Sequence, residues 1–183
     1  RPVPRLITVI DGISCAKVYS LTNNTYAVIW NPVVFIDLAD HWASEVVNDM
    51  GARLIVRGIG EQQFGPDRAV TRAEFVAMLI RGLGLIPDST RNSFVDIRNT
   101  DWYAGAIQAA YAYGLVEGYE DDTFRPKEQM TREQAIAIIA RAMRLTGGNE
   151  ILSAEESAEL LHSYVDASHV SSWAKTAMGD VLQ

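Results

Sequence analysis

Residues 118–134 read GYEDDTFRPKEQMTREQ, and this stretch decides the fold. It begins with a turn-rich loop after Gly118, carries Phe124 as an isolated apolar residue two positions before Pro126, and ends in Thr131-Arg132-Glu133-Gln134. A Thr followed three residues later by Gln forms a capping box, in which the two side chains satisfy backbone N–H groups at the start of a helix. The stretch therefore predicts a loop that leads directly into a helix.

The same pattern occurs earlier in the chain. Residues 42–85 align with residues 102–145 at a constant offset of sixty positions and without a gap, so that GIGEQQFGPDRAVTRAE at 58–74 is the counterpart of residues 118–134. A third start, Tyr164-Val165-Asp166 followed by Trp173, reaches only its first half before Gln183. Repetition at such a period indicates small units that bury their apolar faces against one another.

Each full copy predicts two helices. Residues 102–113 place apolar side chains at spacings of three and four and are followed by Gly114, a residue that commonly ends helices. Ser153-Ala154-Glu155-Glu156 is another capping box and predicts a linker helix. We therefore expect a mainly α-helical body from Phe35 onward, with helices that begin near Trp42, Thr71, Trp102, Thr131, Ser153 and Ser172.

The first 34 residues have a different composition, which is typical of β-strands. Lys17–Thr22 and Thr25–Trp30 are rich in β-branched and aromatic residues and flank Asn23-Asn24, which suits a hairpin turn, and Leu6–Ile10 adds a third candidate strand. We interpret this part as the end of a preceding β-domain or as a small cap on the helical body. The expected division is a β segment at 1–34, repeats at 35–90 and 91–148, and a linker helix with a truncated third repeat at 149–183.

The composition excludes several classes of function. The formal net charge is −7, and without a basic stretch this argues against nucleic-acid binding, whose affinity comes mostly from neutralising phosphates. No apolar run approaches the length of a membrane-spanning helix, so no membrane insertion is expected. The N-terminus lacks a signal-peptide pattern, so the protein is either cytosolic or a piece of something larger. Cys15 is the one cysteine, which excludes an intramolecular disulfide.

The ordered series Phe-x-Asp, Trp-Ala, a helix, Gly-Tyr-x-Asp-x-Thr-Phe-x-Pro and Thr-Arg-Glu-Gln resembles the S-layer homology repeat. The resemblance covers roughly residues 35–145 and the truncated start at 164–183. It implies a pseudo-threefold bundle of helix–loop–helix repeats, in which the first helices of the units meet at a common axis. The lead-in at 26–31 is similar, more weakly, to the junction that precedes three such repeats in large secreted Gram-positive glycoside hydrolases.

The resemblance further implies a non-catalytic cell-wall anchor, located outside the cell at the wall or surface layer, with no cofactor. Its partner would be a cell-wall polysaccharide or a peptidoglycan-linked polymer, often with a pyruvate ketal on the terminal sugar, held in grooves between repeats. A carboxylate suits an Arg side chain and the N–H groups of a helix start. The implied glycan-binding residues are Arg72, Arg132, Trp42, Trp102, Gly58, Gly118, Asp37 and Asp96.

The arginines, tryptophans and aspartates among these residues also have a structural interpretation. The two arginines could be solvated residues at helix starts, and capping alone explains the preceding Thr71 and Thr131. For Trp42, Trp102 and Trp173 we favour packing in the core at the helix start. Asp37, Asp96 and Asp166 are expected to bond backbone groups in the turn before the helix. The glycines are expected to let the backbone approach a ligand closely.

Other interpretations are weaker. Glu120-Asp121-Asp122 lacks the ligand spacing of a calcium loop, and the three histidines and the nucleophiles form no recognisable motif. The main alternative is a structural module that packs only against protein in a surface lattice, and a helix-turn-helix DNA binder is opposed by the charge. Repeat one has Leu54 in place of Gly114 and a different loop, so its groove is expected to differ.

Overall fold

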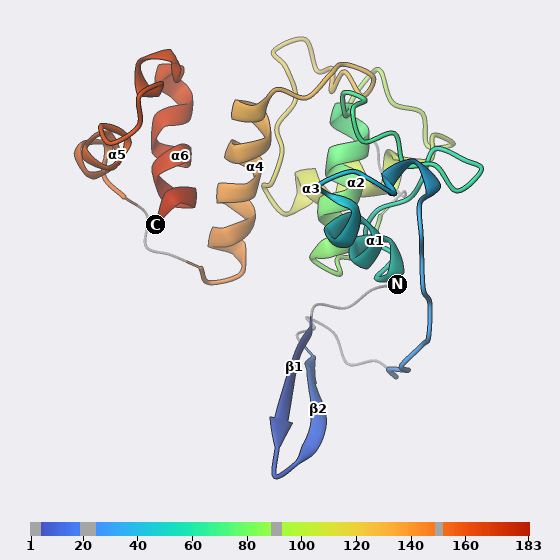
Figure 1. Ribbon diagram of the computed structural model, residues 1–183. Coiled ribbons are helices and arrows are strands. Elements are labelled where there is room, and N and C mark those ends of the chain that lie inside the picture. The colour runs from blue at the N-terminus through green and yellow to red at the C-terminus, as the bar shows by residue number, and fades with distance from the viewer. Residues whose placement is uncertain (1–4, 19–24, 89–92, 149–151) are drawn as a thin grey trace. The chain divides into compact units, whose positions relative to one another are not determined.

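A computed structural model describes residues 5–18, 25–88, 93–148 and 152–183 of the chain (Figure 1). The described part is mainly helical, as predicted, and contains two strands, six α-helices and three short 3-10 helices. The strands are β1 (Arg5–Ile10) and β2 (Ile13–Val18). The α-helices are α1 (Ser44–Ala52), α2 (Arg72–Gly82), α3 (Ala104–Ala112), α4 (Arg132–Leu145), α5 (Ala154–Leu161) and α6 (Lys175–Leu182), and the 3-10 helices are η1 (Ile36–Leu38), η2 (Ala167–His169) and η3 (Ser172–Ala174).

The chain forms two compact units. Unit 1 comprises residues 1–69 and 76–87, and unit 2 comprises residues 70–75 and 88–183. The first turn of α2 therefore belongs to unit 2, although the rest of this helix belongs to unit 1. Five predicted helix starts lie one or two residues before the observed ones, and the sixth, Ser172, is the first residue of η3, which leads into α6 at Lys175. The threefold arrangement of first helices stays a prediction.

The N-terminal β segment is a single antiparallel hairpin, and its position corrects the prediction. β1 includes the expected strand Leu6–Ile10, but its partner is β2, and the turn lies at Asp11-Gly12. Both turn residues have positive φ, 50° and 77°, as a two-residue hairpin turn requires. Residues 25–30 form no strand, and the proposed turn at Asn23-Asn24 lies outside the described residues. The prediction overlooked Asp-Gly, which is the stronger hairpin signal of the two.

The loop between the two helices of a repeat has the same backbone pattern in both copies. Asp37 accepts hydrogen bonds from the N–H groups of Phe64 and Gly65 at 2.9 and 2.7 Å. Asp96 accepts from the corresponding groups of Phe124 and Arg125 at the same two distances. The two carboxylates thus bond to the loop about 28 residues ahead, whereas a bond within the local turn was expected. The N–H of Gly65 is the largest influence on the Asp37 carboxyl and lowers its pKa below the ordinary value.

The first helix of each repeat ends in a residue with left-handed backbone. Gly114 follows α3 with a φ of 66°, and the next N–H, from Leu115, returns to Ala110 O at 2.8 Å. This is a common way to satisfy carbonyl groups at a helix end. After α1 the same place is taken by Leu54, whose φ of 62° is strained for a residue with a Cβ. The difference in sequence between the repeats at this point therefore leaves the chain path unchanged.

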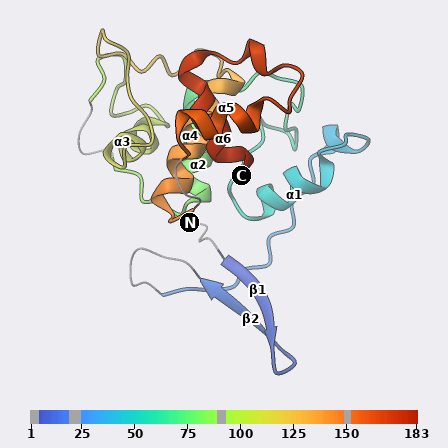
Figure 2. The ribbon, with the colours of Figure 1, turned by 90° about the vertical axis from the view of Figure 1, so that its left-hand side faces the viewer.

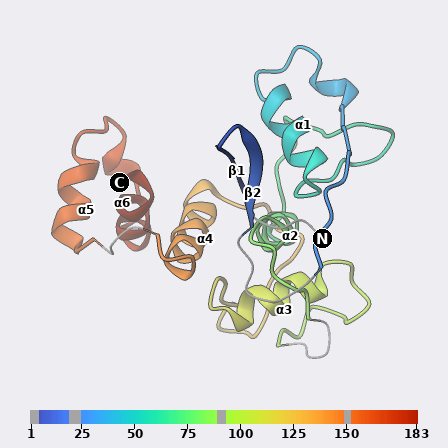
Figure 3. The ribbon, with the colours of Figure 1, turned by 90° about the horizontal axis from the view of Figure 1, so that it is seen from below.

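Within unit 2, α6 packs against both α4 and α5 (Figures 2 and 3). Asp180 on α6 is almost fully buried, accepts from the guanidinium of Arg144 on α4, and accepts from Leu152 N at 3.1 Å. Gly179 faces Ser157 of α5 so closely that a Cβ there would lie 2.8 Å from the Ser157 Cβ. The truncated third repeat is therefore fixed to the second helix of repeat two. None of the helices in the described residues is both long and apolar enough to span a membrane.

Candidate functional site

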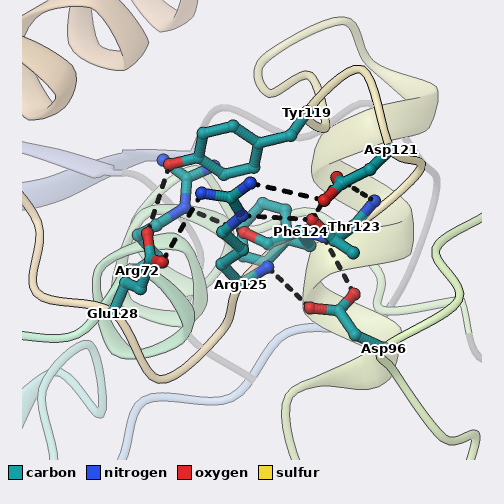
Figure 4. Close-up of polar contacts among 8 residues, drawn as sticks. All are labelled: Arg72, Asp96, Tyr119, Asp121, Thr123, Phe124, Arg125 and Glu128. Carbon is teal, nitrogen blue, oxygen red and sulfur yellow. Dashed lines mark hydrogen bonds and ion pairs between the residues drawn. The ribbon is translucent and has the colours of Figure 1, made fainter.

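The site is built around Arg72, the first residue of α2. Its side chain is 7% exposed, and its Nε donates a hydrogen bond to Phe124 O at 2.9 Å (Figure 4). The guanidinium carbon lies 4.7 Å from the centre of the Phe124 ring and 5.1 Å from that of Tyr119, distances typical of cation–π contact. Burial is the largest influence on the Arg72 guanidinium and lowers its pKa, while the neighbouring Glu128 opposes this. The Arg72 guanidinium is thus a positive charge held in the loop of the following repeat.

The start of α2 is closed to a ligand. The N–H of Arg72 donates to Glu128 O at 2.9 Å, and the N–H of Ala73 donates to Pro126 O at 3.0 Å. Thr71 and Glu74 form the predicted capping box. The expectation that helix-start N–H groups and Arg72 act together on one carboxylate is therefore wrong at this helix. The loop of repeat two already occupies those N–H groups.

Arg132 has the same local sequence position but different surroundings. The Thr131–Gln134 capping box forms as predicted, and the Arg132 side chain is exposed. Among the described residues, no acceptor bonds the backbone N–H of Arg132 or Glu133. A guanidinium beside open N–H groups was expected at the starts of both α2 and α4. Of these two helices, only α4 has it. The loop residues that cover Arg72 have no counterpart within 164–183.

An open pocket of about 290 Å³ lies beside Arg72 in unit 2. Its lining comes from all three repeat segments: the start of α2, the chain between α3 and the loop, the inner face of α4, and η3. The lining residues are Arg72, Val116, Glu117, Gly118, Tyr119, Gln134, Ala137, Ile138, Arg141 and Trp173. The structure thus brings Arg72 and Gly118 together from the predicted set. The other predicted residues do not line this pocket.

The polar or aromatic lining residues that sequence reasoning missed are Glu117, Tyr119, Gln134, Arg141 and Trp173. Arg141 donates to Leu115 O at 3.4 Å and lies 3.3 Å from the carboxylate of Glu117. Gln134 points its amide oxygen at the Thr131 N–H, at 3.1 Å. Trp173 is 57% exposed. Arg141 was visible in the sequence only as a repeated position, Arg81 being its counterpart, and nothing local marks it as a pocket residue.

The loop glycines are explained by packing. A Cβ on Gly118 would lie 2.4 Å from Cε1 of Phe94, and a Cβ on Gly58 would lie 2.4 Å from Gln63 O. Both distances are far below those that real Cβ atoms adopt. The absence of a side chain at these positions is therefore required by the fold itself. Whether a ligand also approaches them stays a prediction.

The acidic residues of the loop are engaged within it. Asp121 accepts from the Thr123 hydroxyl and from Arg125, and Arg125 in turn lies over the Tyr119 ring at 3.9 Å (Figure 4). The Thr123 hydroxyl is the largest influence on the Asp121 carboxyl and lowers its pKa. These contacts, together with those of Asp96, hold the loop in the shape that receives Arg72.

The three tryptophans expected to pack in the core at helix starts correct another expectation. Trp42 is 90% exposed, Trp102 is 66% exposed, and Trp173 is exposed at the pocket, so packing in the core is wrong for all three. The core positions at these helix starts are filled by neighbouring residues, such as Ala43, Tyr103 and Ala174. The indole rings of Trp42 and Trp102 are therefore accessible, although neither lines the described pocket.

The paired helices, the shared loop pattern and the pocket between successive segments define a helical repeat protein. Comparison with known proteins identifies the repeat: the family described as S-layer homology domain matches residues 35–76 and 93–136. Through these two repeats the chain belongs to the S-layer homology family.

The relatives include enzymes and surface proteins. The chain is 35% identical over 163 residues to Exoglucanase XynX of Acetivibrio thermocellus and 32% identical over 175 residues to an amylopullulanase of Thermoanaerobacterium thermosulfurigenes. These matches cover 89% and 95% of this chain but only 14% and 9% of those relatives. A surface layer protein of Brevibacillus choshinensis is 34% identical over 103 residues, which are 54% of this chain and 9% of that protein. The family and its surface-protein members confirm the expected location at the cell wall or cell surface.

Proposed function

We propose that the chain is a non-catalytic module that anchors a secreted or surface protein to the bacterial cell wall. Relatives with different names, an exoglucanase, an amylopullulanase and a surface layer protein, share this segment. A role common to such different proteins fits attachment better than it fits any one reaction. Any catalytic domain of the whole protein would then lie outside these 183 residues.

The ligand we propose is a cell-wall polysaccharide that carries a carboxylate, such as a pyruvate ketal on a sugar. The observation that supports it is the buried guanidinium of Arg72 beside an open pocket in a chain of net charge −7. The Arg72 Nε is bonded to Phe124 O, and no acceptor among the described residues bonds its terminal nitrogens. A buried cation that retains donors toward a pocket favours an anionic group there. The pocket volume of about 290 Å³ suits a sugar unit.

Arg132 is the second candidate position, because its exposed guanidinium lies beside open helix-start N–H groups. The two arginines differ in burial and occupy equivalent repeat positions. They therefore form a matched pair for the experiment that tests the proposal.

Titration of the chain against wall polysaccharide isolated from a Gram-positive bacterium tests the proposal, before and after mild acid removal of its ketal groups. Lys retains the charge but lacks the planar fork of Arg, so Arg72→Lys should weaken binding to the intact polymer. Loss of one charged hydrogen-bonded pair corresponds to roughly 1.5–3 kcal/mol, or about ten- to a hundredfold in affinity. The wild-type chain should bind the acid-treated polymer about as weakly as Arg72→Lys binds the intact polymer. Thermal melts of each variant show whether it is folded.

Arg132→Lys and Arg132→Ala separate the two positions. Weakening by the Arg132 variants alone would place the carboxylate at the start of α4 and remove it from the pocket. No binding of the wild-type chain to either polymer would contradict the proposal and favour a module that packs only against protein.

A further inference from the structure

The pocket contains one acidic side chain among its lining residues, and that acid is paired with an arginine. Glu117 Oε1 lies 3.3 Å from Arg141 Nη2. The Glu117 side chain is 75% exposed and the Arg141 side chain is 35% exposed, so the pair lies at the water-facing side of the pocket. Arg141 is also held from behind by Leu115 O at 3.4 Å. The arginine is thus fixed on one side, while its carboxylate partner is largely in solvent.

Such an exposed pair is easily exchanged. Ion pairs between solvated side chains contribute only about 0–1 kcal/mol, because both groups are well hydrated when apart. Glu117 contacts Nη2 of Arg141, and Leu115 O accepts from Nη1. A second carboxylate that approaches the edge formed by these two nitrogens therefore competes with Glu117 for the Nη2 donor. Glu117 can leave at little cost, since it is already exposed to water. Arg141 cannot follow it, because its other contact is a backbone carbonyl.

Trp173 gives the same pocket a flat apolar surface. Ser171, two residues before Trp173, donates its N–H to the Glu133 carboxylate on α4 at 2.8 Å, and the following Ala174 is fully buried. These two contacts fix the backbone on either side of Trp173, yet its indole remains 57% exposed. An anchored aromatic ring exposed in a pocket is suited to the apolar face of a sugar ring. The amide of Gln134 in the same lining adds a hydrogen-bonding group for a hydroxyl.

We infer that Glu117 is an internal competitor that makes this pocket selective for anionic sugars. The sugar ring packs on Trp173. Its carboxylate lies between Arg72 and Arg141, which both line the pocket, and it binds Arg141 by displacing the Glu117 side chain. A neutral sugar has no anionic group that can replace Glu117 at Arg141, so it makes only the contact with the Trp173 ring. This inference rests on the proposed glycan-anchoring function and deepens it by naming the specificity-determining residues, Glu117, Arg141 and Trp173.

The test uses two probes, a methyl hexoside that carries a pyruvate ketal and the same hexoside without it, titrated against the full chain. In Glu117→Gln the competitor loses its charge, so the ketal-bearing probe should bind about three- to tenfold more tightly, while the plain hexoside is unaffected. Glu120→Gln is the matched control, because Glu120 is an exposed glutamate in the adjoining loop that does not line the pocket. It should bind both probes as the wild type does. A gain of affinity is not produced by a variant that merely unfolds.

Trp173→Ala should weaken both probes by a similar factor, since the ring contact is the same with or without the ketal. The competitor role would be overturned if Glu117→Gln and Glu120→Gln bound the ketal-bearing probe with equal affinity. If the wild type still bound isolated wall polysaccharide, the anchoring function would remain intact. If Glu117→Gln raised the affinity for both probes by the same factor, the competitor role would also be overturned, because selectivity would then not depend on the charge of Glu117. Absence of wild-type binding to the polysaccharide and to both probes would refute the anchoring proposal, and this inference with it.

Discussion

At the scale of single residues, an arginine that follows a capping threonine is buried in one repeat and exposed in the other. Arg72 and Arg132 each follow a capping threonine, yet the first is 7% exposed and the second is exposed to solvent. The capping boxes form in both cases because their bonds are made between residues three positions apart. Burial of the arginine depends on a loop about fifty residues away.

Gly114 provides a test of backbone strain at this scale. Its φ is 66°, and a Cβ there would meet nothing within 4 Å, so Gly114→Ala changes only the backbone energy. We expect the free energy of unfolding to fall by about 1 kcal/mol, measured by urea denaturation. Gly82→Ala in α2 is the control, since a Cβ there makes an ordinary contact at 3.7 Å with Ile55 and no positive φ is required. It should be neutral or slightly stabilising. Equal losses in both variants would contradict the strain argument.

At the scale of secondary-structure elements, unit 2 is held together by close contacts between helices. Asp180 and Arg144 join α6 to α4, and the Gly179–Ser157 approach joins α6 to α5. Ser157 is fully buried, and its hydroxyl has no hydrogen-bond partner among the described residues. Burying an unpaired hydroxyl is unfavourable, because the group loses its bonds to water. The unpaired Ser157 hydroxyl therefore destabilises the contact between α5 and α6, and a substitution can remove it.

Ser157→Ala should raise the free energy of unfolding by about 1 kcal/mol, since it removes the unpaired hydroxyl and places the best helix former inside α5. Gly179→Ala should do the reverse, because its Cβ would lie 3.0 Å from the backbone Cα of Ser157. Thermal melts of both variants and of wild type check the pair. A loss of stability in Ser157→Ala would show that the hydroxyl has a partner that stabilises it.

At the scale of the whole molecule, α2 links successive repeats. Its first turn belongs to unit 2, where three groups of Arg72 and Ala73 donate to loop carbonyls of repeat two. Neighbouring repeats that share such contacts are expected to unfold together. The link is also what forms one end of the pocket.

Arg72→Ala and Arg132→Ala test this link as a matched pair. Arg72→Ala removes a buried side chain and leaves Phe124 O without its donor, so the free energy of unfolding should fall by about 2–3 kcal/mol. Arg132→Ala should change it by no more than about 0.5 kcal/mol, because the side chain is exposed. Urea denaturation followed by circular dichroism and by tryptophan fluorescence measures both. Equal effects of the two variants would mean that the Arg72 contacts do not stabilise the fold.

The sequence by itself determined the features that depend on short-range contacts and on repetition. The capped helices, the duplicated loop and the family all follow from residues close together or from the offset of sixty, because caps and turns are completed by neighbours within a few positions. The hairpin was misplaced although its signal, Asp11-Gly12, was present.

Only the tertiary structure decided which side chains the repeats bring together. Arg72 is buried by residues about fifty positions away, and the pocket joins it to Arg141 and Trp173, which no local pattern connects. The three tryptophans at helix starts show the same limit, since the sequence records that a ring is large and apolar but not whether a neighbouring residue already fills the core. Burial is a property of the packed neighbours, and those neighbours are set by how successive repeats meet.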